Sequence, residues 1–280
     1  MLNLEKLKIW TKWLKPILPP ILTQMASGLA PRIVWEGDYL SWIEAEKNSG
    51  GYAAQEILIK VQNSVLAVLA GKAAFERDGV AFTHADPNFT LLASLYQAIE
   101  KHDEIAIIDF GGSLGSTFLQ SRPWLSKGLS SWMVVEQPSF VEAGKKLYRD
   151  INIQFTSSLS EARKWAENRA IFLHTAAVLQ YLNDPVVELR MLIEELDPEW
   201  IYLDRVPYIC GSKSRLTVQR VPPSICSASY PCWFFSRDLF ETVLSSSHEK
   251  VFTFAASDRC IDFQATFEGS FWRRKINGRS

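Results

Sequence analysis

Residues 105–116 read IAIIDFGGSLGS, and this stretch decides the expected fold. The apolar residues 105–108 run without interruption into Asp109, and glycines follow at 111, 112 and 115. A short apolar run that ends in an acid and glycines is typical of a buried parallel strand that turns directly into a helix. Similar apolar runs recur along the chain, at 132–136, 153–155, 170–173 and 200–203.

Segments with helical character separate these runs, at 114–124, 140–149, 159–167 and 185–196. Regular alternation of strand and helix predicts an α/β sheet of parallel strands with helices on both faces. The end of the chain differs, because only a short turn joins residues 250–255 to 262–273. A turn of that length leaves no room for a crossover helix, so the last two strands are expected to be antiparallel to one another.

The sequence divides into three expected parts. Residues 1–34 are predicted to form an amphipathic helix and a proline-rich linker, and residues 35–102 a helical cap with helices over 56–75 and 89–99. Residues 103–280 are predicted to form the α/β domain, with 207–235 inserted as a lid over its binding edge. This lid is long for one loop and rich in proline and aromatic residues.

Residues 3–15 place Leu and Trp side chains on one side of a helical wheel and charged side chains on the other. Such a helix can lie in a membrane interface or dock on a protein, and the sequence leaves both open. Net charge is −1, with basic residues concentrated at both ends and an acidic middle. An acidic middle gives no sign of a surface that follows nucleic-acid phosphates, so no nucleic-acid partner is expected.

The expected binding site lies at the carboxyl ends of the parallel strands, where open sheets bind ligands. Glycines at 111, 112 and 115 allow a ligand to approach the backbone closely. Glu136 ends the next apolar run, where its carboxylate can accept hydrogen bonds from both ribose hydroxyls of a nucleotide. An ordinary solvated strand end is the alternative for Glu136. No metal site is predicted.

With the loop, the strand-end acid and the terminal antiparallel pair, the chain resembles the class I S-adenosylmethionine-dependent methyltransferases. Their first motif runs acid-x-Gly-x-Gly-x-Gly, which Asp109, Gly111 and Gly115 match and Ser113 departs from. The resemblance implies a Rossmann-like, seven-stranded, mainly parallel sheet, a helical region before it, and S-adenosylmethionine as cofactor. It implies cofactor contacts from Asp109, Gly111, Gly112, Ser113, Gly115, Glu136, Gln137, Thr156, Ser157, His174 and Thr175.

More narrowly, residues 35–52, the stretch VLQYLNDP at 178–185 and DRVP at 204–207 resemble a largely uncharacterised family of bacterial methyltransferases. Members of that family tend to occur among cell-surface polysaccharide genes. The resemblance implies a role in polysaccharide biosynthesis but assigns no acceptor.

Methyl transfer requires that donor and acceptor be held in line and that water be excluded. For a hydroxyl acceptor, His174 is the candidate base, and Asp204 is the reserve candidate. The acceptor contacts are expected from Tyr181, Arg205, Tyr230 and Trp233. Other interpretations remain open: His174 as a buried core histidine, Tyr181 as packing, and Asp204 with Arg205 as a structural ion pair.

Two other functions share the glycine loop and the strand-end acid. One is an NAD-dependent oxidoreductase, and the other is a cofactor-binding but inactive partner protein at a membrane-associated assembly. Four cysteines without a paired spacing favour a reducing compartment. The expected location is therefore the cytoplasm, with residues 3–15 as a peripheral contact to the inner face of the membrane.

Overall fold

The computed structural model describes residues 32–50, 54–102, 104–125, 130–148, 151–223 and 228–276. Its centre is a seven-stranded sheet in the order β11-β12-β8-β7-β4-β5-β6. Five of these strands are parallel: β4 (Ile105–Phe110), β5 (Ser130–Val135), β6 (Ile153–Thr156), β7 (Ala170–Ala176) and β8 (Trp200–Ile209). Strand β12 (Ala265–Arg274) runs antiparallel to both β8 and β11 (His248–Ala255). The predicted fold class is confirmed.

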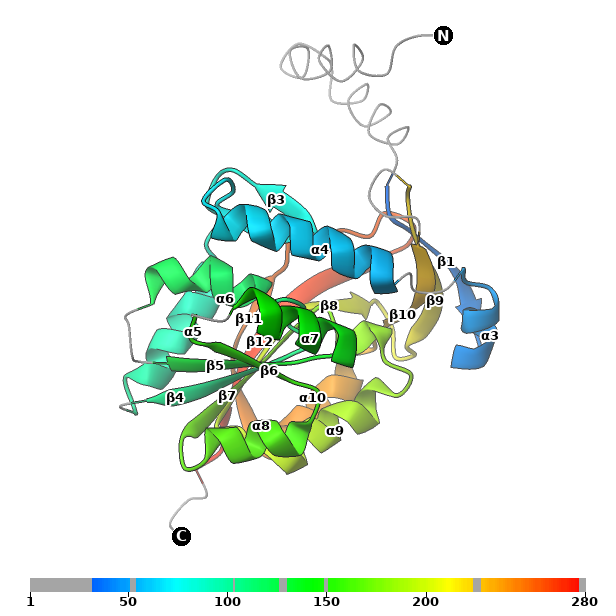
Figure 1. The fold of residues 1–280 in the computed structure, drawn as a ribbon. Helices are drawn as coiled ribbons and strands as arrows, with labels where there is room; N and C mark the ends of the chain where they lie inside the picture. The colour runs from blue at the N-terminus through cyan, green and yellow to red at the C-terminus, as the bar shows by residue number, and fades with distance from the viewer. Residues whose placement is uncertain are drawn as a thin grey trace, which may run out of the picture.

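Helices cover both faces of this sheet (Figure 1). One face packs against α4 (Ala54–Leu69), α5 (Phe89–Ile99), α6 (Ser116–Ser121) and α7 (Pro138–Leu147). The other face packs against α8 (Leu159–Ala166), α9 (Pro185–Leu196) and α10 (Arg237–Ser245). Alternate residues of β4 serve the two faces: Ile107 belongs to the first core and Ile108 to the second. A strand buried on both faces is continuously apolar for this reason.

Two predicted helices have the predicted bounds, α5 and α9. Helix α9 begins where Asp184 accepts a hydrogen bond from the Val187 N–H at 3.2 Å, and Pro185 occupies the first turn. Both features are strong local start signals. The sequence does not predict helix α10, because its residues directly follow the segment interpreted as a lid.

The region 35–102 is not wholly helical, which corrects the sequence-based expectation. It contains β1 (Val34–Tyr39), the short helix α3 (Trp42–Lys47), and a hairpin of β2 (Phe75–Arg77) and β3 (Val80–Phe82). The hairpin turns at Asp78 and Gly79, with φ of 52° and 75°. Left-handed values at both positions are typical of the tight turn that an Asp-Gly pair favours, so this pair is a usable signal in the sequence.

The segment 207–235 is not an irregular loop, which corrects the second expectation. Strand β8 continues to Ile209, and β9 (Arg215–Val221) and β10 (Ala228–Phe234) pair antiparallel. With β1 they form a three-stranded sheet in the order β1-β9-β10, standing beside the main sheet (Figure 1). Pro231 fits because β10 is an edge strand of this sheet, where a missing N–H is tolerated.

Two single-turn 3₁₀ helices complete the described part of the chain, η1 (Arg122–Trp124) and η2 (Leu179–Tyr181). The predicted helix at 3–15 lies outside the described residues, and the division into three domains stays a prediction. Among the described helices, none is long and apolar enough to cross a membrane.

Candidate active site

The glycine loop joins β4 to α6 and packs tightly against its neighbours. Gly111 and Gly115 have left-handed φ values of 70° and 77°. A Cβ added to Gly111 would lie 2.3 Å from a methyl of Val178, so only glycine fits there. Ser113, which stands where the methyltransferase motif has its middle glycine, also has a left-handed φ, of 55°. The loop therefore keeps a glycine-like backbone at the position that departs from the motif.

Glu136 lies directly after β5, next to the glycine loop. Its carboxylate accepts the N–H of Gln137 at 2.7 Å and is also hydrogen-bonded to the backbone N–H of Ser113. Burial raises the pKa of Glu136 above its ordinary value, although both N–H groups pull it down. The loop and the predicted ribose acid thus meet at one edge of the sheet.

The predicted adenine contacts lie one strand further along. Thr156 ends β6, is buried, and donates its hydroxyl to Glu161 at 2.5 Å. Ser157 is exposed, as is Gln137. These side chains occupy the carboxyl ends of β5 and β6, the place that the resemblance implies for them.

A cavity of about 370 Å³ opens on the other side of the glycine loop, toward the ends of β7 and β8. This volume is within the range of small-molecule sites. Seven predicted residues line it: Asp109, Gly111, Gly112, Ser113, His174, Asp204 and Arg205. Glu136, Gln137, Thr156, Ser157, Gly115 and Thr175 are not part of its lining. Thr175 is buried, and its hydroxyl has no partner among the described residues.

Strand register brings the catalytic candidates together. Asp109 on β4 is the direct neighbour of His174 on β7, and His174 that of Tyr202 on β8. The imidazole Nδ1 of His174 lies 2.7 Å from the Asp109 carboxylate. The sequence indicates Asp109 only as a cofactor contact and does not pair it with His174, because 65 residues separate the two.

Asp204, the reserve base, also reaches the cavity. Its carboxylate accepts the Arg205 N–H at 2.7 Å and the Asn88 side-chain amide at 3.0 Å. Burial raises the pKa of Asp204 above its ordinary value, against the opposing effects of His174 and of these N–H groups. Asn88 is also the cap of α5, where its oxygen accepts the Leu91 N–H.

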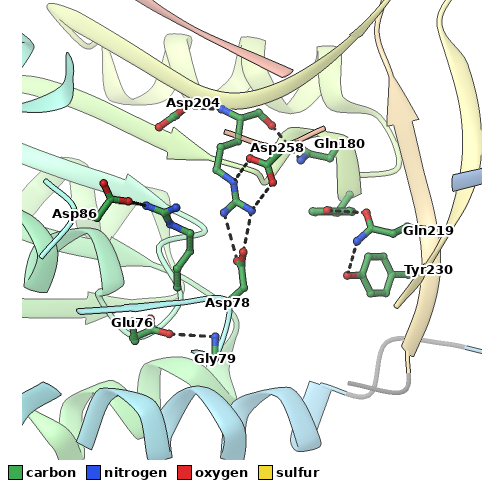
Figure 2. A network of polar contacts seen from close by, with 12 residues as sticks. Glu76, Asp78, Gly79, Asp86, Gln180, Asp204, Gln219, Tyr230 and Asp258 are labelled. Atoms are coloured by element: carbon green, nitrogen blue, oxygen red, sulfur yellow. Dashed lines mark hydrogen bonds and ion pairs between the residues drawn. The ribbon is translucent and has the colours of Figure 1, made fainter. Parts of the chain in front are cut away.

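Arg205 is held between two carboxylates (Figure 2). It bonds Asp258 at 2.9 and 3.0 Å and Asp78 at 2.8 Å. Burial lowers the pKa of Arg205, but the two carboxylates outweigh it and raise the pKa well above its ordinary value. The guanidinium therefore ties the β2–β3 hairpin to the segment after β11.

Glu76 on β2 forms a further wall of the cavity, which the sequence does not reveal. Glu76 is only 2% exposed and accepts hydrogen bonds from the Ser116 hydroxyl and, at 3.1 Å, from the Gly79 N–H. Burial raises the pKa of Glu76 to about 7. It lies between the two helices predicted for this region, and the Asp-Gly turn beside it is the signal for a hairpin.

Tyr181, Tyr230 and Trp233, predicted to contact the acceptor, lie away from the cavity lining. The Tyr181 hydroxyl donates to Gln219 at 2.9 Å, and the Gln219 amide donates to the Tyr230 oxygen at 3.2 Å (Figure 2). Trp233 is half-buried against two apolar clusters. Their assignment as acceptor contacts stays a prediction.

No described group of three or more His, Cys, Asp and Glu side chains could hold a metal ion. An organic cofactor could contact the close-packed glycine loop, the adjoining Glu136 and the neighbouring cavity.

No family profile and no curated protein matches this chain. Among solved structures, the N-terminal domain of EvdMO1, in the presence of SAH and D-fucose, is 14% identical over 80% of this chain and 98% of that chain, with a TM-score of 0.49. CalS10, an amino pentose methyltransferase from Micromonospora echinaspora with bound SAM, is 9% identical over 67% and 89%, with a TM-score of 0.44. An S-adenosylmethionine-dependent methyltransferase from Clostridium acetobutylicum is 8% identical over 66% and 89%, with a TM-score of 0.45.

The last two neighbours are methyltransferases by their descriptions. At these identities and TM-scores, the likeness does not establish what this chain binds or transfers.

Proposed function

We propose that this chain transfers a methyl group from S-adenosylmethionine to a hydroxyl of a small, carbohydrate-type acceptor. The observation that carries the proposal is the joining of three features at one sheet edge. A tightly packed glycine loop adjoins the Glu136 carboxylate on one side and a polar cavity containing an imidazole on the other. The first two features suit a nucleoside with an amino-acid tail, and the third suits a hydroxyl that must lose a proton.

The residues fit this cofactor in a definite way. Gly111 to Gly115 would hold its amino-acid part, Glu136 its ribose, and Thr156 with Ser157 would flank its base. When bound, the cofactor supplies a methyl group that its positive sulfur already activates. The chain has to position the acceptor and accept a proton, because an activated methyl needs alignment more than further polarisation.

Within the cavity, His174 is the proposed base and Asp204 a second polar wall. The hairpin bearing Glu76 and Asp78 closes the cavity from the side of α4, where Arg205 secures it. The Asp78 carboxylate is itself exposed, and the charge and hydrogen bond of Arg205, with the Arg77 charge, hold its pKa below its ordinary value. The hairpin is therefore an integral wall that helps to exclude water from the reacting atoms.

Calorimetric titration of the purified full chain tests the cofactor. Binding of S-adenosylmethionine and of its demethylated product, with no binding of NAD, is the expected result. Binding of NAD alone would favour the oxidoreductase alternative, which shares the glycine loop and the strand-end acid.

Transfer of a radiolabelled methyl group to a panel of free and nucleotide-linked sugars tests the reaction. Product on at least one sugar hydroxyl is expected. Cofactor binding without transfer to any member of the panel, or to simple alcohols and amines, would favour the inactive-partner alternative.

The proposed place of action is the cytoplasm, in polysaccharide biosynthesis, with residues 3–15 as the contact to the membrane. These residues lie outside the described part of the chain. Deletion of residues 1–25 should abolish binding to anionic lipid vesicles and leave cofactor affinity intact. Failure of the full-length protein to bind vesicles would remove the membrane contact.

A further inference from the structure

Asp109 opens the glycine motif, yet its side chain is buried and bonded within the protein. Both of its oxygens are already engaged inside the protein. One lies 2.7 Å from Nδ1 of His174, and the other accepts the indole N–H of Trp132 at 3.3 Å. Asp109 is 1% exposed.

The glycine loop covers the Asp109 carboxylate from above. A Cβ added to Gly112 would lie 2.5 Å from this carboxylate, so the loop backbone rests directly on it. A buried carboxylate is stable only when its oxygens accept hydrogen bonds, and here His174 and Trp132 supply them. The carboxylate is therefore committed to the protein interior and not to the loop's outer surface, where the cofactor is proposed to bind.

His174 is fixed in orientation from two sides. Asp109 holds Nδ1, and the Tyr202 ring stacks on the imidazole with centroids 5.7 Å apart and planes at 22°. Tyr202 is itself anchored, because its hydroxyl lies 2.7 Å from that of Thr90 on α5. A carboxylate accepts rather than donates, so the proton of the neutral imidazole sits on Nδ1 and Nε2 is left as the acceptor.

Nε2 has no hydrogen-bond partner among the residues that the structure describes, and His174 lines the cavity. We propose that Asp109 is the positioning residue of an Asp–His pair with His174, and that it fixes the tautomer so that Nε2 receives the proton of an acceptor hydroxyl. This inference rests on the proposed methyl transfer for its chemistry, and on strand register for its geometry.

The step balances in atoms and charge. The acceptor oxygen forms a bond to the methyl carbon, and the carbon–sulfur bond breaks with its electron pair remaining on sulfur. The hydroxyl proton moves to Nε2, and the Asp109 carboxylate stabilises the resulting imidazolium. The proton then passes to solvent once the product has left.

Several charged or ionisable groups surround the imidazole. Asp109 contacts it from β4, and Tyr202 and Asp204 approach it from β8. Arg205 adjoins Asp204, and Glu76 lies on the wall of the same cavity. Among the described residues, Asp109 alone makes a hydrogen bond to the ring, so its removal should have the largest effect.

Imidazole NMR on the ¹⁵N-labelled full chain tests the inference without an acceptor. The sequence has 4 histidines, and His174→Gln assigns the relevant signal by its loss. In the wild type we expect the Nδ1–H tautomer. In Asp109→Asn we expect a changed tautomer balance, because the carboxylate that holds the Nδ1 proton is gone.

A second variant protects the test against a folding defect. Trp132→Phe removes the other donor to Asp109 but keeps the carboxylate beside His174, so the Nδ1–H tautomer should persist. The control is the half-exposed pair of His102 and Glu199, 3.0 Å apart. Glu199→Gln should change the His102 tautomer signal much less, because that pair is open to solvent.

Calorimetry with the demethylated cofactor separates this inference from the proposed function. Asp109→Asn should bind it within about threefold of the wild-type affinity, a change far smaller than loss of a charged contact causes. A tenfold or larger loss of affinity with an unchanged His174 signal would overturn the inference and return Asp109 to the cofactor site. No cofactor binding by the wild type would instead overturn the proposed function, and the NMR result would still decide the pairing.

Discussion

Two clusters of aromatic and polar side chains have residue types that suit contact with a carbohydrate acceptor. Only one of them lines a cavity. Around His174, polar side chains that include Asp204 and Glu76 line a cavity of about 370 Å³, and the buried Asp109 bonds the imidazole. Around Gln219, the side chains of Trp35, Tyr181 and Tyr230 bond to that amide and fall outside the cavity's lining. Similar residue types thus form a site at the strand ends of the main sheet, and a packed joint where the three-stranded sheet meets η2.

The two clusters differ in whether a polar side chain still has an unused hydrogen-bonding atom. Gln219 is 4% exposed, and its amide oxygen accepts from Trp35 at 3.0 Å and from Tyr181 at 2.9 Å. At His174 one ring nitrogen is used and the other has no partner among the described residues. A group with unused capacity at a cavity can act on a ligand, whereas a satisfied group in a joint stabilises the fold.

The largest expected effect is on turnover. His174→Gln should lower methyl transfer by about 10²–10⁴-fold, the usual contribution of a general base, and leave cofactor affinity nearly unchanged. Radiolabel transfer measures the first and calorimetry the second. His102→Gln is the matched control, since His102 pairs with Glu199 outside the cavity lining. Full turnover in His174→Gln would remove the proposed base.

The next effect concerns the pH dependence of stability through Glu76. Its pKa of about 7 in the folded protein lies above the ordinary value of 4.5. Between these two pH values, Glu76 is therefore protonated in the folded protein and ionised in the unfolded chain. The stability that this group contributes is complete below about pH 4.5 and is lost as pH rises through about 7.

As pH rises across that window, the free energy of unfolding of Glu76→Gln should therefore increase relative to that of the wild type, by about 3 kcal/mol in total. Urea unfolding at several pH values measures the difference. Glu46→Gln is the control, because Glu46 is exposed on α3. Parallel stability curves for Glu76→Gln and the wild type would show that Glu76 is ionised in the folded protein.

A smaller effect is expected in the joint. Gln219→Leu leaves the Trp35 indole and the Tyr181 hydroxyl without an acceptor, and should lower the free energy of unfolding by about 2 kcal/mol. Turnover and KM should not change at temperatures where the variant is folded. Gln154→Leu, at an exposed position of β6, is the control. A raised acceptor KM would instead support the prediction that Tyr181 and Tyr230 contact the acceptor.

The smallest effect is expected at the cofactor edge. Glu136→Gln keeps the shape of the side chain and removes its charge, and should weaken binding of the demethylated cofactor by about 1.5 kcal/mol, or roughly tenfold. Calorimetry measures it, with exposed Glu142→Gln on α7 as control. Equal affinities in all three proteins would mean that Glu136 does not contact the ribose.

The sequence is sufficient to predict the main sheet because its signals are local. Each parallel strand contains a short apolar run, which Gln154 interrupts in β6, and α9 carries its own start signal in Asp184 and Pro185. The glycine loop can also be identified, since Gly111 and Gly115 occupy left-handed positions that the spacing itself suggests. Strand periodicity, capping and turn chemistry act over a few residues, so a single sequence records them.

The three-stranded sheet and the cavity depend on contacts between distant parts of the chain, so only the tertiary structure revealed them. Strand β1 pairs with β9 far along the chain, Val34 opposite Arg220, and Arg205 reaches Asp78 from 127 residues away. The pairing of Asp109 with His174 likewise comes from the order of β4 and β7 in the sheet. Which polar groups become satisfied and which remain free depends on such long-range neighbours, and composition or spacing does not encode them.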